Sequence, residues 1–121
     1  MAAILVDVLG FSEVARASGQ VALAAHEGSG GRICLHESGA PTRGRVGAGT
    51  IHHVAFRARD ARDQADMAER LRSDYDIAVS VSKDRSYYQS IHFRGPDGIL
   101  VEIATDGPGF LIDEEVEALG R

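Results

Sequence analysis

Residues 50–58 read TIHHVAFRA, and residues 98–106 read GILVEIATD. Both are short, mostly apolar runs of the kind that forms buried β-strands. Each run contains an ionisable side chain, His53 in the first and Glu102 in the second, 102 − 53 = 49 positions later. Such a side chain in an apolar strand is costly unless it is paired or bound to a metal. A histidine and a carboxylate are also two of the three ligands of the facial triad that holds non-haem iron.

Composition limits the classes of protein to which the chain can belong. Its 121 residues are enough for one domain, and 44% hydrophobic with 26% charged residues is typical of a globular protein. A net charge of −5 gives no basic field for nucleic acid. The single cysteine, Cys34, suits a reducing compartment. No basic leader and no apolar run of about 20 residues is present, so we expect a cytoplasmic protein without a membrane segment.

The first third of the chain predicts a short helix followed by a three-stranded meander. Residues 2–9 form the predicted helix, which ends at Gly10. The predicted strands cover residues 11–17, 21–26 and 32–37, separated by glycine- and serine-containing turns. Residues 39–49 contain Pro41 and four glycines, which is typical of a linker.

The region after the linker predicts one strand, one helix and three further strands. The helix covers residues 60–73, with Asp60 as N-cap. The predicted strands cover residues 51–58, 77–81, 87–94 and 99–105. A Gly-Pro-Asp-Gly turn at residues 95–98 joins the last two, and a short helix is expected over residues 114–119.

The resulting element order indicates a repeat. Residues 50–110 read as a complete βαβββ module, and residues 1–38 read as the same module without its opening strand. Residues 111–121 form a tail. We therefore expect one α+β domain over residues 1–121, built of paired βαβββ modules with helices on one face of each sheet.

Five segments resemble the last module of ring-cleaving extradiol dioxygenases, above all the hydroquinone-cleaving ones. These enzymes belong to the glyoxalase/bleomycin resistance/dioxygenase (vicinal oxygen chelate) superfamily. The segments are LVDVLGF (5–11), TIHHVAFR (50–57), DRSYY (84–88), SIHFRGPDG (90–98) and EIATDGPGF (102–110).

The resemblance implies a role for each of five residues. His53 and Glu102 match metal ligands, with Fe(II) or Mn(II) as the cofactor. His52 and Arg85 match catalytic positions that orient the substrate and handle protons or negative charge. His92 stands where relatives carry a tyrosine, and from there it could donate a hydrogen bond to substrate or oxygen. The third ligand of such relatives, a histidine, comes from the first of four modules, whereas this chain corresponds to the C-terminal half.

The resemblance therefore implies part of an Fe(II)-dependent dioxygenase that acts on a small hydroquinone- or catechol-type aromatic and O2. A homodimer, or a complex with a separate N-terminal half, would complete the metal site. Two alternatives stay open at this point. One is a metal-dependent lyase or isomerase of the same superfamily, and the other is a non-catalytic module that binds a small molecule, as bleomycin-resistance proteins do.

The residues alone also allow a purely structural role at each of these positions. Of the histidine pair, one could be a core residue and the other a surface residue, and Glu102 could face water on an edge strand. Arg85 could be a surface arginine at a strand end, and His92 could belong to the polar face of a hairpin. The remaining expectations concern His26 and His36, which should face solvent, and Cys34, which should be a small core residue.

Overall fold

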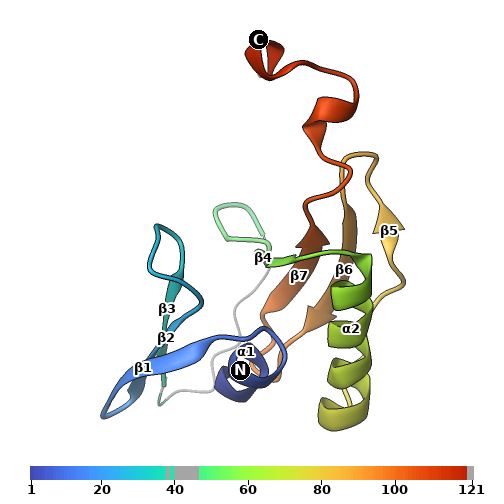
Figure 1. Ribbon diagram of the computed structural model, residues 1–121. Helices are drawn as coiled ribbons and strands as arrows, with labels where there is room; N and C mark the ends of the chain where they lie inside the picture. Colours follow the sequence, from blue (N-terminus) through green and yellow to red (C-terminus); the bar gives the residue numbers. More distant parts are fainter. Residues whose placement is uncertain (38, 40–46, 120–121) are drawn as a thin grey trace. The chain divides into compact units, whose positions relative to one another are not determined.

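A computed structural model describes residues 1–37, 39 and 47–119 of the chain (Figure 1). The chain divides into two compact units, Met1–Arg45 and Val46–Arg121, which are described separately below. Most of the predicted linker, residues 40–46, lies outside the described residues. Within the described ranges, no helix has the length and apolar character needed to cross a membrane.

The first unit consists of one short helix and a three-stranded antiparallel sheet. Helix α1 (Ala2–Asp7) precedes strands β1 (Ser12–Ala17), β2 (Gln20–Ala24) and β3 (Arg32–His36). The strands pair in the order β1-β2-β3, so the predicted helix and meander are confirmed (Figure 1).

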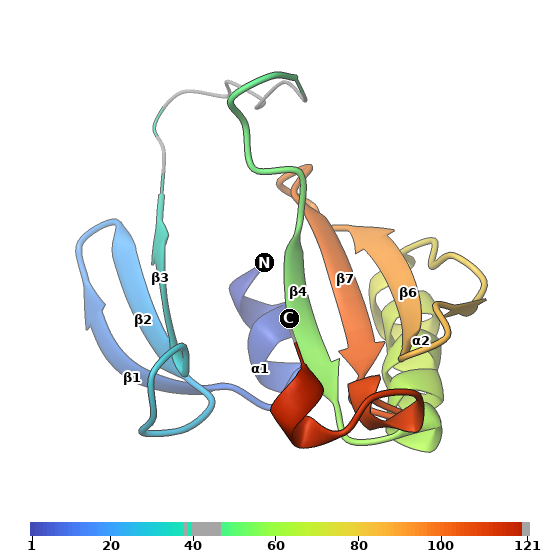
Figure 2. The same ribbon diagram turned by 90° about the horizontal axis from the view of Figure 1, so that it is seen from above.

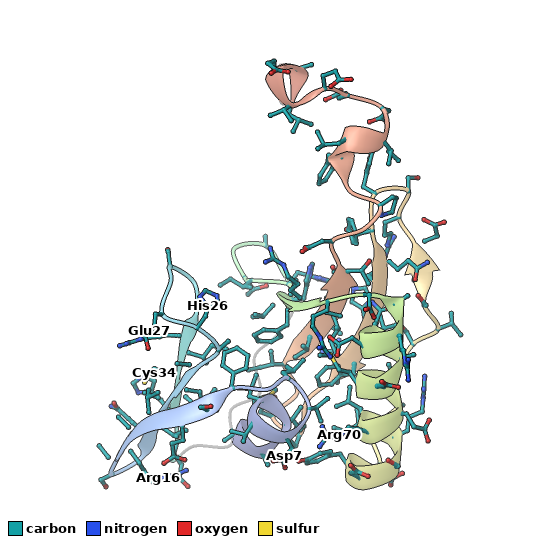
Figure 3. All side chains as sticks on the ribbon, in the orientation of Figure 1. Asp7, Arg16, His26, Glu27, Cys34 and Arg70 are labelled. Atoms are coloured by element: carbon teal, nitrogen blue, oxygen red, sulfur yellow. The ribbon has the colours of Figure 1, made fainter. Side chains whose placement is uncertain are left out.

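Apolar side chains from the helix and the central strand of the first unit are buried. Ile4 and Leu5 of α1 are almost fully buried, as are Val21 and Leu23 of β2. Val21 and Leu23 are two residues apart and so lie on the same face of β2. Cys34 of β3 is exposed, so the prediction of a core cysteine was wrong (Figure 3). It pairs with Ala22 and therefore lies on the face opposite the buried Val21 and Leu23.

The second unit is a four-stranded mixed sheet with one long helix. It contains β4 (Val54–Ala58), α2 (Ala61–Tyr75), β5 (Lys83–Asp84), β6 (Gln89–Arg94) and β7 (Leu100–Thr105). The strand order is β4-β7-β6-β5, with β4 parallel to β7 and the other pairs antiparallel. The predicted βαβββ order and the α+β class are confirmed, and Figure 2 shows α2 beside the sheet.

Helix α2 begins at a side-chain cap and contacts the sheet along one stripe. The Asp60 carboxylate accepts a hydrogen bond from the Asp63 backbone N–H at 2.8 Å, as the predicted N-cap requires. Ala68 and Leu71 are buried. Gln64 is also buried, and its Nε2 donates to the backbone oxygens of Ile103 at 2.9 Å and Gln89 at 3.1 Å. These bonds tie α2 to β7 and β6 at the same point.

Three predicted elements differ from the structure. The first strand of the second unit begins at Val54 and not at Ile51. Residues 77–81 form no strand, only an isolated bridge between Val79 and Phe93, and the outer strand is β5, six residues later in the chain than predicted. The predicted helix over residues 114–119 is a single 3-10 turn, η2 (Val116–Ala118).

The segment that follows β7 is held to the loop between β5 and β6. Another 3-10 turn, η1 (Phe110–Ile112), places Phe110 against Tyr87 with ring centroids 4.7 Å apart. The Tyr87 hydroxyl donates to Asp113 at 2.9 Å, and this hydrogen bond, together with the negative charge of Asp113, raises the pKa of Tyr87. The Gly109 N–H donates to the Tyr87 carbonyl oxygen at 2.7 Å. Tyr87 is thus the anchor of this segment.

Candidate metal and substrate site

Strand register brings two of the predicted site residues, Glu102 and His92, to one face of the second sheet, together with Ala55. Glu102 of β7 is paired with Ala55 of β4 on one side and with His92 of β6 on the other. Paired residues point to the same side of a sheet, so these three side chains share a face. The neighbouring buried residues Ile91, Phe93 and Ile103 alternate with these positions and therefore point to the other side of the sheet. We call the side that carries Glu102 and His92 the open face.

Glu102 is the centre of the candidate site. The residue is 8% exposed and accepts a close contact from His92, whose Nε2 lies 2.6 Å from Glu102 Oε2. His53 Nε2 lies 3.9 Å from the same oxygen. The rings of His53 and His92 are 6.0 Å apart. Glu102 is therefore not a carboxylate facing open water, and both histidines approach it.

The histidine pair lies just before β4, outside the strand itself. His52 Nδ1 and His53 Nδ1 are 2.9 Å apart, so one nitrogen donates and the other accepts. This contact engages Nδ1 of His53 and leaves its Nε2 on the side of Glu102. Metal-binding histidines are commonly fixed through their second ring nitrogen in this way. His52 is thus placed to orient His53.

Arg85 flanks the same face from the outer strand. It follows β5 directly, and its backbone N–H donates to the Tyr88 carbonyl oxygen at 2.8 Å. Its Nε donates to the hydroxyl of Ser90 at 3.4 Å. Ser90 lies two residues before His92 in β6 and therefore on the open face. The Arg85 head group is thereby held beside the site, without direct contact to Glu102.

The donor atoms of His53 and Glu102 suit a metal that takes nitrogen and oxygen ligands. Two ligands that are each about 2.1 Å from a shared metal lie no more than about 4.2 Å apart. The observed 3.9 Å separation satisfies that limit. Across residues 1–37, 39 and 47–119, however, no set of three His, Cys, Asp or Glu side chains could hold a metal ion. The described part of the chain thus offers two ligands.

The other two histidines belong to the first unit. His26 Nδ1 accepts a hydrogen bond from the Gly28 N–H at 3.0 Å, and Figure 3 marks its side chain. His36 is the last residue of β3. Both residues are exposed, as expected.

Two residues of the open face, Ser90 and Arg57, were not identified from the sequence as part of the site. Ser90 is fully buried and positions Arg85. Arg57 shares the face of Ala55 and forms an ion pair with Asp106 at 2.9 Å. Both follow from the two-residue period of a strand: Ser90 lies two residues before His92 in β6, and Arg57 lies two residues after Ala55 in β4. That signal was available in the sequence.

The model of the Glyoxalase/Bleomycin resistance protein/Dioxygenase superfamily matches residues 1–103. The chain belongs to this superfamily. Among its curated members, "Putative ring-cleaving dioxygenase MhqA" of Bacillus subtilis is 40% identical over 98% of this chain and 39% of its own length. "Chlorohydroquinone/hydroquinone 1,2-dioxygenase" of Sphingobium indicum is 34% identical over 73% of this chain and 27% of its own length.

Solved structures of superfamily members show the same fold. A crystal structure named as a "putative dioxygenase" from Bacillus subtilis has a TM-score of 0.84 and 36% identity, covering 99% of this chain and 38% of that chain. The fosfomycin resistance protein FosX of Listeria monocytogenes, solved with Mn(II) and sulfate, has a TM-score of 0.66 and 22% identity over 86% of this chain and 77% of its own. At that identity the likeness shows the fold alone.

The chain spans less than two fifths of the length of these dioxygenase relatives. Superfamily membership and dioxygenase-type homology are thus established. The activity, the substrate and the partners of the longer proteins are a separate matter.

Proposed function

We propose that this chain supplies two metal ligands and the substrate-orienting side chains of a ring-cleaving dioxygenase that acts on hydroquinone- or catechol-type aromatics. The observation that supports this most strongly is the approach of His53 Nε2 to within 3.9 Å of Glu102 Oε2 on the open face. It occurs in a chain that is 40% identical to a protein named as a ring-cleaving dioxygenase.

In this proposal His53 and Glu102 hold Fe(II) or Mn(II) as two members of a facial triad. The metal supplies electron transfer between an aromatic diol and dioxygen, the chemistry typical of two-histidine, one-carboxylate sites. The overall reaction breaks a ring carbon–carbon bond beside a hydroxyl group and leaves both oxygen atoms of O2 in the product.

The side chains around the ligands would bind the substrate and manage its charge. Arg85, held by Ser90 at the edge of the open face, would stabilise the negative oxygen of a deprotonated diol. His52 is exposed. A His53 that binds the metal through Nε2 carries its proton on Nδ1 and donates it to His52 Nδ1, so neutral His52 keeps its own proton on Nε2 and would donate a hydrogen bond from there to a substrate oxygen. Thus His52 and Arg85 are the residues to which we assign hydrogen-bond donation to the substrate and charge stabilisation.

The third ligand would come from residues outside this 121-residue segment. The described residues offer two ligands, and the dioxygenase relatives are more than twice as long as the matched region. A second copy of the chain, or a chain that carries the N-terminal portion of such relatives, would each complete the triad. Light scattering combined with metal analysis distinguishes these cases. A homodimer that binds metal by itself supports the first, and a chain that binds metal only after the N-terminal portion is added supports the second.

Oxygen uptake tests the proposed activity. The assembly that completes the site, either the homodimer or the complex with an N-terminal portion, is loaded anaerobically with Fe(II) and mixed with hydroquinone, methylhydroquinone or catechol in an oxygen-electrode cell. We expect one O2 consumed per ring opened, with uptake abolished in His53→Ala and Glu102→Gln. The control His36→Ala, an exposed histidine of the first unit, should retain full uptake.

The same experiment separates the alternatives. Turnover of a superfamily substrate without oxygen consumption would contradict a dioxygenase and support a lyase or isomerase. Binding of the aromatic compound that is equal in wild type and His53→Ala, with no oxygen uptake by either, would support a non-catalytic binding module.

A further inference from the structure

The hairpin that carries Arg85 has a tight tip with a strained backbone. The ladder between β5 and β6 continues into the loop, because the Arg85 N–H donates to the Tyr88 carbonyl oxygen at 2.8 Å. Only Ser86 and Tyr87 therefore remain at the tip. Ser86 has a φ of 69°, in the left-handed region that residues with a side chain disfavour, and its N–H donates to the Asp84 carboxylate at 2.8 Å. A backbone of this kind persists where surrounding contacts hold it.

The segment after β7 holds this tip from outside the hairpin. We call its residues 109–113 the C-terminal clasp, and Figure 1 shows the segment beside the loop between β5 and β6. The Gly109 N–H donates to the Tyr87 carbonyl oxygen at 2.7 Å. The Phe110 ring stacks on the Tyr87 ring with their planes 25° apart, and the Tyr87 hydroxyl donates to Asp113 at 2.9 Å. The clasp thus contacts the backbone, the ring and the hydroxyl group of one tip residue.

The Arg85 side chain depends on the tip for its position. Its Nε donates to the Ser90 hydroxyl at 3.4 Å, which is the long end of the range for a hydrogen bond and therefore weak. Within the described part of the chain, this is the only hydrogen bond of the Arg85 side chain. Arg85 is exposed, and one weak bond cannot restrict a side chain with this many rotatable bonds. The direction of its head group is therefore set mainly by the backbone of the tip.

We propose that the C-terminal clasp fixes the tip of the β5–β6 hairpin, and that Tyr87 is thereby a positioning residue for Arg85. This inference rests on the proposed role of Arg85, which is to stabilise the negative oxygen of a bound diol. A charged group stabilises such an oxygen best when it already points at it before the substrate arrives. A displacement of about 1 Å can cost about 100-fold in rate. A segment outside the sheet would in this way control how well the substrate binds.

Variants that remove the clasp contacts one at a time test this role. Tyr87→Ala removes the ring and hydroxyl contacts, Asp113→Ala removes only the acceptor, and Asp113→Asn keeps a side-chain oxygen that can accept. Asp113 is exposed, so its replacement leaves the core intact. Val116→Ala, at an exposed position of the same tail outside the clasp, is the matched control.

Nitrogen-15 spectra of the metal-free protein give a readout that does not depend on activity. Loss of one hydrogen bond should speed hydrogen exchange of the Arg85 backbone N–H about 2- to 12-fold in Asp113→Ala, and further in Tyr87→Ala. The Arg85 Nε–H signal, assigned by its absence in Arg85→Lys, should shift toward its position in the unfolded chain in both variants. Asp113→Asn and Val116→Ala should match wild type. An unchanged Arg85 Nε–H signal in Tyr87→Ala and Asp113→Ala would overturn the inference.

Oxygen uptake by the complete assembly gives the second readout. Asp113→Ala should raise the KM for hydroquinone about 2- to 12-fold with a smaller change in kcat, because the contact serves substrate binding. Asp113→Asn should restore the wild-type KM. A fall in kcat at unchanged KM would contradict the positioning role. If no assembly consumes oxygen while the Arg85 signals respond as expected, the ring-cleavage proposal fails and the hold of the clasp on Arg85 is established.

Discussion

Replacing Gln64 should destabilise the second unit, because this residue connects α2 to the two strands that carry the site. Its Nε2 donates to the backbone oxygens of Ile103 in β7 and Gln89 in β6, at 2.9 and 3.1 Å. The side chain is 3% exposed, so water cannot replace the lost donors. Gln64→Leu keeps most of the volume and removes both of these hydrogen bonds, together with the longer one that Oε1 accepts from the Ser82 hydroxyl at 3.4 Å.

Each lost bond is worth about 0.5–1.5 kcal/mol, so we expect Gln64→Leu to lower the free energy of unfolding by about 1–3 kcal/mol. With a urea m-value of about 1–3 kcal/mol per molar, the midpoint should fall by roughly 1 M. Glu69→Leu, at an exposed position of the same helix, is the matched control and should change stability by less than about 0.5 kcal/mol.

Tyrosine fluorescence and near-ultraviolet circular dichroism are the appropriate probes. The chain has no tryptophan, and its three tyrosines, Tyr75, Tyr87 and Tyr88, all lie in the second unit. The signal therefore reports on the sheet that Gln64 supports. If Gln64→Leu and Glu69→Leu gave the same midpoint as wild type, the reasoning from buried donors would be refuted.

Three further predictions concern α2. Asp60→Ala should lower the free energy of unfolding by about 1 kcal/mol in urea melts, whereas Asp60→Asn, which keeps the cap, should not; equal losses would contradict the capping role. Leu71→Ala, at a fully buried position, should cost about 2–5 kcal/mol in the same assay, and a loss below 1 kcal/mol would mean that the site is loosely packed. The hydrogen bond from the Arg59 side chain lowers the pKa of Asp63 below its usual 3.8. The ionised Asp63 carboxylate therefore stabilises the folded state above pH 3.8, and this stabilisation is lost as the pH falls through the pKa of Asp63 in the folded protein. Thermal melts should therefore show Asp63→Asn less stable than wild type at pH 6–7, with a difference that shrinks below pH 4; a pH-independent difference would contradict this cause.

Local signals in the sequence predicted most of the fold. The glycine-bounded meander, the Asp60 cap with its apolar stripe and the βαβββ order all depend on residues close together in the chain, and all are confirmed. The outer strand β5 was missed because it has only two residues, both exposed, and carries no periodic pattern. Its pairing is imposed by β6 and cannot be read from its own sequence.

The contact between His92 and Glu102 required knowledge of strand register. The turn over residues 95–98 was predicted, and pairing Arg94 with Leu100 around it brings His92 opposite Glu102. A shift of one residue would send the two side chains to opposite faces of the sheet. The resemblance identified both positions as functional, but only the register shows that they contact each other.

Binding of Mn(II), measured by calorimetry on wild type, His53→Ala, Glu102→Gln and His36→Ala, tests the central claim most directly. If His53 and Glu102 are metal ligands, the first two variants lose at least about tenfold in affinity, because each removes one ligand, and His36→Ala matches wild type. Equal affinity in all four proteins would contradict the assignment of the open face as a metal site.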